Sequence, residues 1–245
     1  MSAPVSAPWW RPFRNLDGVS VVHVDLTADP DHEAEAVAWL DEGERGRWEG
    51  YPYSGPQRQF LLCRAALRAA LCEQLGCGNG ELAFETSEHG KPWARVGGVE
   101  APISFNVSHG GRHGLIAIAP GGRLGVDVEE LGDRRNLDLL MDGVLGENEH
   151  REVASKGGAA QLRSFFRLWT MKEALLKAHG KGLLVDATTF EIPPSVRDGA
   201  PRGQIELPQL PGVTLQVEDI AGEDFAAALA REVISEAGGE RAQSR

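Results

Sequence analysis

The stretch Phe165–Gly182, FFRLWTMKEALLKAHGKG, decides the fold of the second half of this chain. Gly180 follows its last periodic residue, at a place where helices commonly end. At 3.6 residues per turn the apolar side chains fall on one stripe, which predicts a long helix that packs against a core: Phe165, Leu168, Met171, Leu175 and Ala178.

The other face of this predicted helix carries Phe166, Trp169, Glu173 and Lys177, the last three at intervals of four residues. The simplest interpretation is a solvated face with a Glu–Lys pair, which stabilises a helix by about 0.3 kcal/mol. Two large aromatic side chains favour another interpretation, because a face turned to water seldom carries both. We therefore expect something to pack against this face.

A second stretch, Gly125-Val-Asp-Val-Glu129, alternates apolar and acidic residues, which is typical of a β-strand. Asp127 and Glu129 then share one face, where like charges repel unless a cation lies between them. Taken alone, the strand fits a solvent-facing edge as well as a metal site. Glu173 would add a third carboxylate and complete an all-oxygen site suited to Mg²⁺.

Length and composition exclude several classes of protein. The chain has 245 residues, enough for one large domain or two small ones, with 42% hydrophobic and 25% charged residues. A net charge of −11 argues against a general binder of nucleic acids or anionic membranes. Three cysteines suggest neither a disulfide framework nor a zinc site. Without an apolar run of membrane-spanning length or a leader pattern, we expect a cytoplasmic protein.

Weaker motifs lie in the first half. Ile103–Gly110 predicts an apolar strand that ends in Ser108-His109-Gly110 at a tight turn, which is either a turn cap or a grip for phosphate oxygens. A Ser–His–Asp hydrolase is disfavoured because no G-x-S-x-G elbow occurs. Gly90-Lys91-Pro92 alone is only a turn. Gln57–Leu75 predicts a helix whose Arg58 and Arg64 are either solvated or bind a ligand.

The order of predicted elements repeats. A strand at Val19–Asp25, a helix that ends at Gly76 and a strand at Phe84-Glu85 are echoed by Val126–Glu129, the helix that ends at Gly180 and a strand at Phe190-Glu191. Pro120–Gly122 is the best linker. We predict an α+β fold of two similar α/β halves, 1–120 and 121–234, and a disordered tail, 235–245. Residues 1–18 are expected to form an extended arm, and strands at Ile205–Leu207 and Val213–Val217 to close the second half.

Four motifs in order, G-K-P, F-N-x-S-H, G-x-D-x-E and W-x-x-K-E-A-x-x-K-x-x-G-x-G, resemble the Sfp-type 4′-phosphopantetheinyl transferases. The resemblance covers roughly Arg58 to Phe190. It implies two similar halves related by a pseudo-twofold axis, with the active site in the cleft between them. It also implies transfer of the phosphopantetheine arm of coenzyme A to a serine of an acyl or peptidyl carrier protein, with release of 3′,5′-ADP. Valine replaces the usual isoleucine in the G-x-D-x-E strand, and Ala174 stands where some relatives have serine; neither difference touches a chemical role.

The resemblance also implies roles for single residues. Mg²⁺ would be held by Asp127, Glu129 and Glu173. Coenzyme A would be bound by a set of mostly basic residues: Arg58, Arg64, Lys91, Pro92, Ser108, His109, Lys172 and Lys177. Trp169 would form a wall of the site, Lys177 would stabilise the departing ADP beside the catalytic Glu173, and either Glu149, twenty residues before Trp169, or a metal-held water would take the serine proton. A monomer would suffice, because one chain supplies both halves of the cleft.

Two other functions remain open. A non-catalytic module that binds coenzyme A or a carrier protein would have no need of Asp127, Glu129, Glu173 and Lys177 together. A magnesium-dependent phosphohydrolase would give no role to Lys91, Ser108 or His109. For the carrier, the best candidate for docking is the segment after the carboxylate strand, where Arg134 and Arg135 precede the apolar run Leu137–Met141. The same run fits equally well a short helix packed into the core with its arginines in water.

Overall fold

The computed structural model describes residues 8–87, 90–132, 136–180 and 185–233. Its first half contains β1 (Trp10–Leu16), β2 (Val19–Asp25), α1 (Pro30–Val37), α2 (Glu42–Glu49), α3 (Ser54–Leu75), the 3₁₀ turn η1 (Asn79–Glu81), β3 (Leu82–Thr86), β4 (Pro92–Val96), β5 (Val99–Glu100), β6 (Ser104–Gly110) and β7 (His113–Ala119). The second half contains β8 (Leu124–Glu130), α4 (Leu137–Val144), α5 (Glu147–Ala154), α6 (Gly158–His179), the 3₁₀ turn η3 (Ala187–Thr189), α7 (Pro194–Arg197), β9 (Arg202–Glu206), β10 (Thr214–Asp219) and β11 (Phe225–Glu232).

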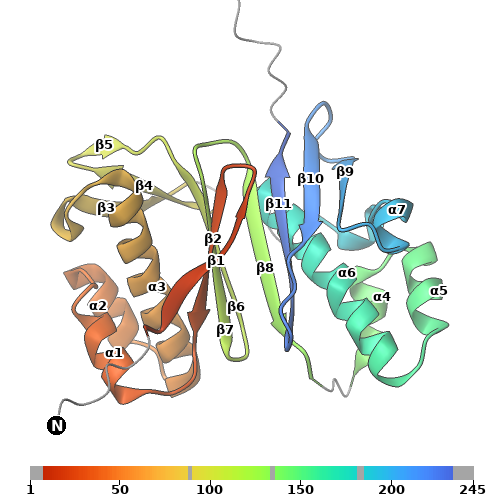
Figure 1. Cartoon of the computed structure of the whole chain (residues 1–245), viewed down its shortest axis with the longest axis horizontal. Helices are drawn as coiled ribbons and strands as arrows, with labels where there is room; N and C mark the ends of the chain where they lie inside the picture. The colour runs from red at the N-terminus through yellow and green to blue at the C-terminus, as the bar shows by residue number, and fades with distance from the viewer. Residues whose placement is uncertain (1–7, 88–89, 133–135, 181–184, 234–245) are drawn as a thin grey trace, which may run out of the picture.

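Two four-stranded sheets meet in the middle of the molecule, and the helices cover their outer faces (Figure 1). The first sheet has the order β1-β2-β7-β6 and the second the order β8-β11-β10-β9. A third, small sheet, β3-β4-β5, extends the first half. The layers are therefore helix, sheet, sheet and helix.

The two halves repeat one plan, as expected from the sequence. In each, a strand leads through three helices to an antiparallel pair, and the sheet order β2-β7-β6 matches β8-β11-β10. The long helices α3 and α6 both end at a left-handed glycine, Gly76 with φ +64° and Gly180 with φ +89°, where side chains other than glycine are disfavoured. The predicted α+β fold of two similar halves is confirmed.

Each half has a core of its own, and a third core joins them. The core between α6 and the second sheet contains Phe165, Met171 and Leu175, so the predicted apolar stripe is confirmed. The joining core lies between the sheets and takes alternate side chains of β2, β7, β8 and β11: Val19, Val21, Leu115, Ala117, Leu124, Val126, Val128, Ala227 and Leu229. Because both sheets turn an apolar face inward, β8 is buried and is not a solvent-facing strand.

Several predicted elements differ in the structure. The arm predicted over residues 1–18 is wrong for Trp10–Leu16, which pairs with β2 as an edge strand. Phe190-Glu191 is not a strand, since it follows η3 without pairing. Ser108 and His109 lie inside β6, and the turn comes at Gly111-Arg112. The tail 235–245 lies outside the described residues.

Strand β11 has no counterpart in the sequence-based prediction. Its sequence, FAAALARE, is rich in alanine, which favours helices over strands. Tertiary packing decides the matter: Ala226, Ala228 and Ala230 face the core under α6, whereas Ala227 and Leu229 face the first sheet. Small side chains let the helix and the two sheets approach closely on both sides of this strand.

A buried histidine pair lies at one end of the joining core. His23 on β2 and His113 on β7 share a hydrogen bond of 3.0 Å between His23 Nε2 and His113 Nδ1. His113 Nε2 lies 3.4 Å from Asp224, and the ring of His23 stacks on Phe225 at 5.5 Å. Burial, and after it His113, lower the pKa of His23 from 6.5 to about 4.

We expect this pair to make stability fall in acid. An unfolded His23 takes up a proton near pH 6.5, whereas the folded one resists until about pH 4, so stability is full above pH 6.5 and is lost between these values. The loss amounts to at most about 3 kcal/mol. Urea unfolding from pH 7 to 4 measures it. His23→Gln should flatten the profile, whereas His150→Gln, at a partly exposed site outside this core, should not; an equally steep profile in His23→Gln would contradict this origin.

Candidate active site between the halves

A pocket of about 380 Å³ opens between the two halves. Three elements supply its walls: β6 from the first half, and β8 and α6 from the second. Its lining is Val107, Ser108, His109, Asp127, Glu129, Trp169, Glu173 and Lys177. The structure thus brings the carboxylate strand, the polar face of the long helix and the Ser-His pair to one place.

Two glycines allow the close approach that forms this pocket. A Cβ atom on Gly125 would lie 2.1 Å from the Ala174 carbonyl oxygen, so only glycine lets β8 pack onto α6 at this point. A Cβ atom on Gly110 would lie 2.5 Å from the Val128 carbonyl oxygen, which fixes the contact of β6 with β8. The glycine of G-V-D-V-E therefore sets the distance between Asp127 and the helix.

Lys177 lies at the centre of the polar contacts in the pocket and donates three hydrogen bonds there. Its Nζ donates to Ser108 Oγ and to Asp127 Oδ1, both at 2.7 Å, and to the Val126 carbonyl at 3.2 Å. The Ser108 hydroxyl in turn donates to Asp127 Oδ1 at 2.8 Å. One lysine therefore ties the two halves together across the pocket.

The carboxylates fit a cation by their chemistry. Asp127 is buried, and its Oδ2 is a buried oxygen without a hydrogen-bond donor. Partial burial, and after it the nearby Asp127, raise the pKa of Glu173, as happens when carboxylates gather without enough positive charge. Within the described residues, however, no group of three or more acidic, histidine or cysteine side chains converges closely enough to hold a metal. The predicted three-carboxylate site stays a prediction.

Aromatic contacts position Trp169 at the wall of the pocket. Its ring meets Phe165 edge to face, with centroids 5.2 Å apart, and Phe165 contacts Phe166 in the same way at 5.5 Å. Both phenylalanines are fully buried. Phe166 therefore belongs to the core, although the helical pattern places it beside the polar residues.

A second pocket, of about 240 Å³, continues the first and shares Val107 and His109 with it. Arg64 and Pro92 line it, together with Arg47, Tyr51 and Phe60, which the sequence analysis missed. Arg47 lies in the last turn of α2, whose charged sequence has no apolar period, and Tyr51 follows that helix, so no pattern marked either residue. Arg64 Nη1 is buried without an acceptor, and burial lowers the pKa of this guanidinium. An anionic ligand in this pocket would accept a hydrogen bond from Arg64 Nη1 and would favour the charged form of the guanidinium.

Two models of protein families match the chain. Residues 123–230 match the model of the 4′-phosphopantetheinyl transferase superfamily, and residues 28–121 match that of the N-terminal part of a 4′-phosphopantetheinyl transferase. The chain belongs to the 4′-phosphopantetheinyl transferase superfamily. The resemblance inferred from the four motifs is confirmed.

Curated relatives agree with this assignment. A Synechocystis protein is 35% identical over 60% of this chain and 59% of its own length. The 4′-phosphopantetheinyl transferase gsp of Aneurinibacillus migulanus is 33% identical over 54% and 52%, and HetI of Nostoc is 29% identical over 68% and 70%. The chain thus spans between half and three fifths of the first two relatives.

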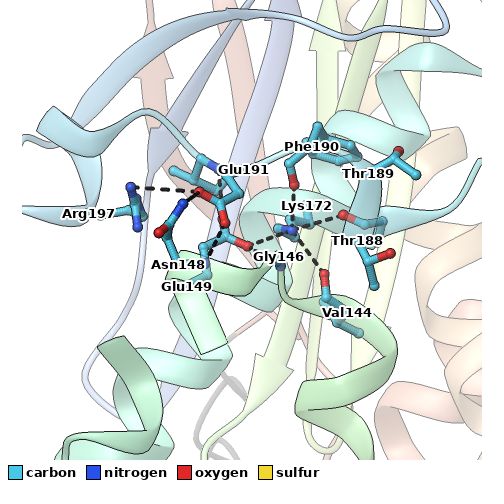
Figure 2. Close-up of polar contacts among 12 residues, drawn as sticks. Val144, Gly146, Asn148, Glu149, Lys172, Thr188, Thr189, Phe190, Glu191 and Arg197 are labelled. Carbon is cyan, nitrogen blue, oxygen red and sulfur yellow. Dashed lines mark hydrogen bonds and ion pairs between the residues drawn. The ribbon is translucent and has the colours of Figure 1, made fainter. Parts of the chain in front are cut away.

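Four residues that the family resemblance assigned to the site lie outside both pockets. Lys91 Nζ donates to the Leu124 carbonyl at 3.1 Å, and Arg58 pairs with Glu33 at 3.4 Å. Lys172 and Glu149 are fully buried and form an ion pair of 2.6 Å behind α6 (Figure 2). In this arrangement Glu149 cannot reach a serine and Lys172 cannot reach coenzyme A, because each is enclosed by protein on all sides.

Proposed function

We propose that this protein transfers the 4′-phosphopantetheine group of coenzyme A to a serine of an acyl or peptidyl carrier protein, with release of 3′,5′-ADP. The observation that carries the proposal is the pocket between the halves, where Asp127, Glu129, Glu173 and Lys177 meet Ser108 and His109. Membership of the superfamily supports the same reaction.

In this reaction the serine oxygen forms a bond to the phosphorus that carries the pantetheine arm. The bond from that phosphorus to the oxygen of 3′,5′-ADP breaks, ADP leaves with the bonding electron pair, and the proton of the serine is released to solvent. Mg²⁺ is the cation we expect at Asp127, Glu129 and Glu173, where it would neutralise charge on the pyrophosphate. Lys177 faces the same phosphates and stabilises the charge that grows on the departing ADP. The transfer needs mainly positioning and electrostatics from the protein.

Coenzyme A is proposed to run from this pocket into the second one. Arg64, Pro92 and His109 line the continuation, and the guanidinium of Arg64, whose Nη1 is buried, supplies positive charge there. His109 is proposed to donate to a phosphate oxygen, and Ser108, whose hydroxyl now donates to Asp127, would have to turn away from Asp127 to do the same. Arg58 and Lys91 stay predicted ligands that would have to leave their present partners to bind.

We expect His109→Ala to raise the KM for coenzyme A about tenfold with little change in kcat. Its proposed partner is a phosphate away from the bond that breaks, so the contact is equal in the ground and transition states. Partial burial, and after it Lys177, lower the pKa of His109, so a neutral ring that donates one hydrogen bond is expected near pH 7. Steady-state kinetics with a saturating carrier measure both constants. His32→Ala, on α1, is the control, and a kcat loss at constant KM would place His109 at the reacting phosphorus.

The acceptor is proposed to dock beside the pocket. α4 follows the carboxylate strand, and Leu139 on it is 70% exposed, which suits an apolar contact. Arg134 and Arg135, predicted to assist, lie outside the described residues. No helix in the described part of the chain is long and apolar enough to cross a membrane. The cytoplasmic location and the monomeric state stay predictions, as does the division into two domains near residue 120.

One experiment tests the proposed function. The protein is incubated with coenzyme A, Mg²⁺ and a panel of apo-carrier proteins, and the masses of the carriers are measured. A carrier that gains one phosphopantetheinyl group only in the presence of Mg²⁺ supports the proposal. Binding of coenzyme A without transfer to any carrier would support a non-catalytic module, and hydrolysis of coenzyme A without an acceptor would support a phosphohydrolase.

A further inference from the structure

Lys172 is held by oxygen atoms from three separate segments. Its Nζ donates to the carbonyls of Val144 at 2.9 Å, Ala187 at 2.9 Å and Phe190 at 2.8 Å, besides the ion pair with Glu149 (Figure 2). The three carbonyls belong to the end of α4 and to the segment around η3. One fully buried ammonium therefore joins α6 to the end of α4, to α5 and to the segment around η3.

Glu149, the other member of the ion pair, accepts hydrogen bonds from two backbone amides. Its Oε2 accepts from the Gly146 amide at 2.9 Å at the start of α5, and its Oε1 accepts from the Ile192 amide at 2.7 Å. The pair is thus fully hydrogen-bonded, as a buried pair must be. Apolar side chains of equal volume often stabilise a core as well as such a pair does, so its role lies in fixing one arrangement.

The first half contains a matching buried cation with similar hydrogen-bond partners. Arg68 on α3 stands eight residues before Gly76, as Lys172 stands eight residues before Gly180. Its Nε donates to Glu44 at 2.8 Å, and its Nη1 donates to the carbonyl of Leu82, the first residue of β3, at 3.0 Å. Glu44 accepts from the Asp41 amide at the start of α2, just as Glu149 accepts at the start of α5.

The two halves share these buried cations, Lys172 and Arg68, which we call the anchors. The functional side chains beside the anchors differ between the halves. Glu173 directly follows Lys172, whereas Ala69 directly follows Arg68. On α3 the residue next to the anchor in space is Arg64, whose Nε lies 3.5 Å from the same Glu44. Each buried cation therefore stands beside a different functional side chain, a carboxylate in the second half and a cation in the first.

We propose that Lys172 and Arg68 are equivalent positioning residues, which fix the rotation of α6 and α3 and thereby aim Glu173 at the divalent cation and Arg64 at coenzyme A. The inference rests on the proposed function. A rotation of α6 by about 20° would move a carboxylate about 5 Å from the helix axis by about 2 Å. Such a displacement is enough to disrupt a cation site, which needs its oxygen ligands at defined distances.

The test compares two matched double variants, Lys172→Met with Glu149→Gln, and Arg68→Met with Glu44→Gln. Each removes the buried charges of one anchor and keeps the volume. The affinity for Mn²⁺ is measured by electron paramagnetic resonance at saturating coenzyme A, and the affinity for coenzyme A by calorimetry without metal. Circular dichroism and urea unfolding show whether each variant is folded.

The first variant is expected to weaken Mn²⁺ binding about tenfold and leave the affinity for coenzyme A within about twofold, in line with residues that support metal ligands. The variant that combines Arg68→Met with Glu44→Gln should weaken the binding of coenzyme A about tenfold and leave the affinity for Mn²⁺ within about twofold. Should the Lys172 variant not fold, Lys172→Arg, which keeps the charge pair with Glu149 but replaces the compact ammonium with a larger planar group, is expected to weaken Mn²⁺ binding about threefold.

Unchanged Mn²⁺ affinity in a folded Lys172 variant would overturn the inference, and so would an equal loss in the Arg68 variant, since that would indicate general destabilisation. A wild-type protein that binds no Mn²⁺ beside coenzyme A would overturn the proposed metal site itself. That outcome is distinct, because it appears before any substitution is made.

Discussion

Asp127→Ala and Glu173→Ala are expected to lower phosphopantetheinyl transfer at least about a thousandfold while both proteins stay folded. Each substitution removes an oxygen ligand from the place where the pyrophosphate must be neutralised, and electrostatic contacts of this kind dominate phosphoryl transfer. Holo-carrier formation, followed by mass spectrometry at saturating coenzyme A and Mg²⁺, measures the loss.

The two variants should differ in stability, which separates a loss of chemistry from a loss of fold. Asp127 accepts from Lys177 and Ser108, so its removal is expected to cost about 1–2 kcal/mol of unfolding free energy. Glu173 has a raised pKa, because burial and Asp127 disfavour its charge, so its removal should be neutral or slightly stabilising at pH 7.

Glu130→Ala is the matched control for both. Glu130 stands on the same strand but pairs with Arg112 at 2.7 Å, outside the pocket. It should keep near-normal activity. Near-normal activity in Asp127→Ala or Glu173→Ala would show that the cation is held elsewhere, and a general collapse of either variant would make its carboxylate a structural group.

The parts of the fold that follow from local pattern were predictable from the sequence. α3 and α6 have the 3.6-residue apolar period and a glycine stop, and β2 and β8 alternate by twos. β11 was not predictable, because its alanines follow from the space between two sheets and a helix. Burial on both sides, rather than propensity, makes it a strand.

The candidate site divides in the same way. Asp127, Glu173 and Lys177 could be grouped from the sequence because strand and helix periodicity each place them on one face. Glu149 and Lys172 share the acidic and basic character of the site residues, and only the packing of α5 and η3 against α6 shows that they point away from it. The spacing of residues along a helix predicts the face on which a side chain lies, but it does not predict what packs against that face.

Lys177→Met is expected to lower kcat for transfer about a hundredfold to a thousandfold, with a smaller rise in the KM for coenzyme A. Lys177 is a cation that lines the pocket beside the carboxylates, with its Nζ 2.7 Å from Asp127 Oδ1 and 2.7 Å from Ser108 Oγ. Charge on the leaving ADP grows only in the transition state, so a cation aimed at it acts mainly on kcat.

Three comparisons decide between this role and simpler ones. Lys177→Arg keeps the charge on a larger, planar group and should recover part of kcat. Lys156→Met, which replaces an exposed lysine that donates a hydrogen bond to Ser164, should leave kcat unchanged. If Lys177→Met instead raises the KM at constant kcat, Lys177 only holds coenzyme A in the ground state. If Lys177→Arg is as inactive as Lys177→Met, the reaction requires the compact ammonium held between Ser108 and Asp127, and positive charge alone is not enough.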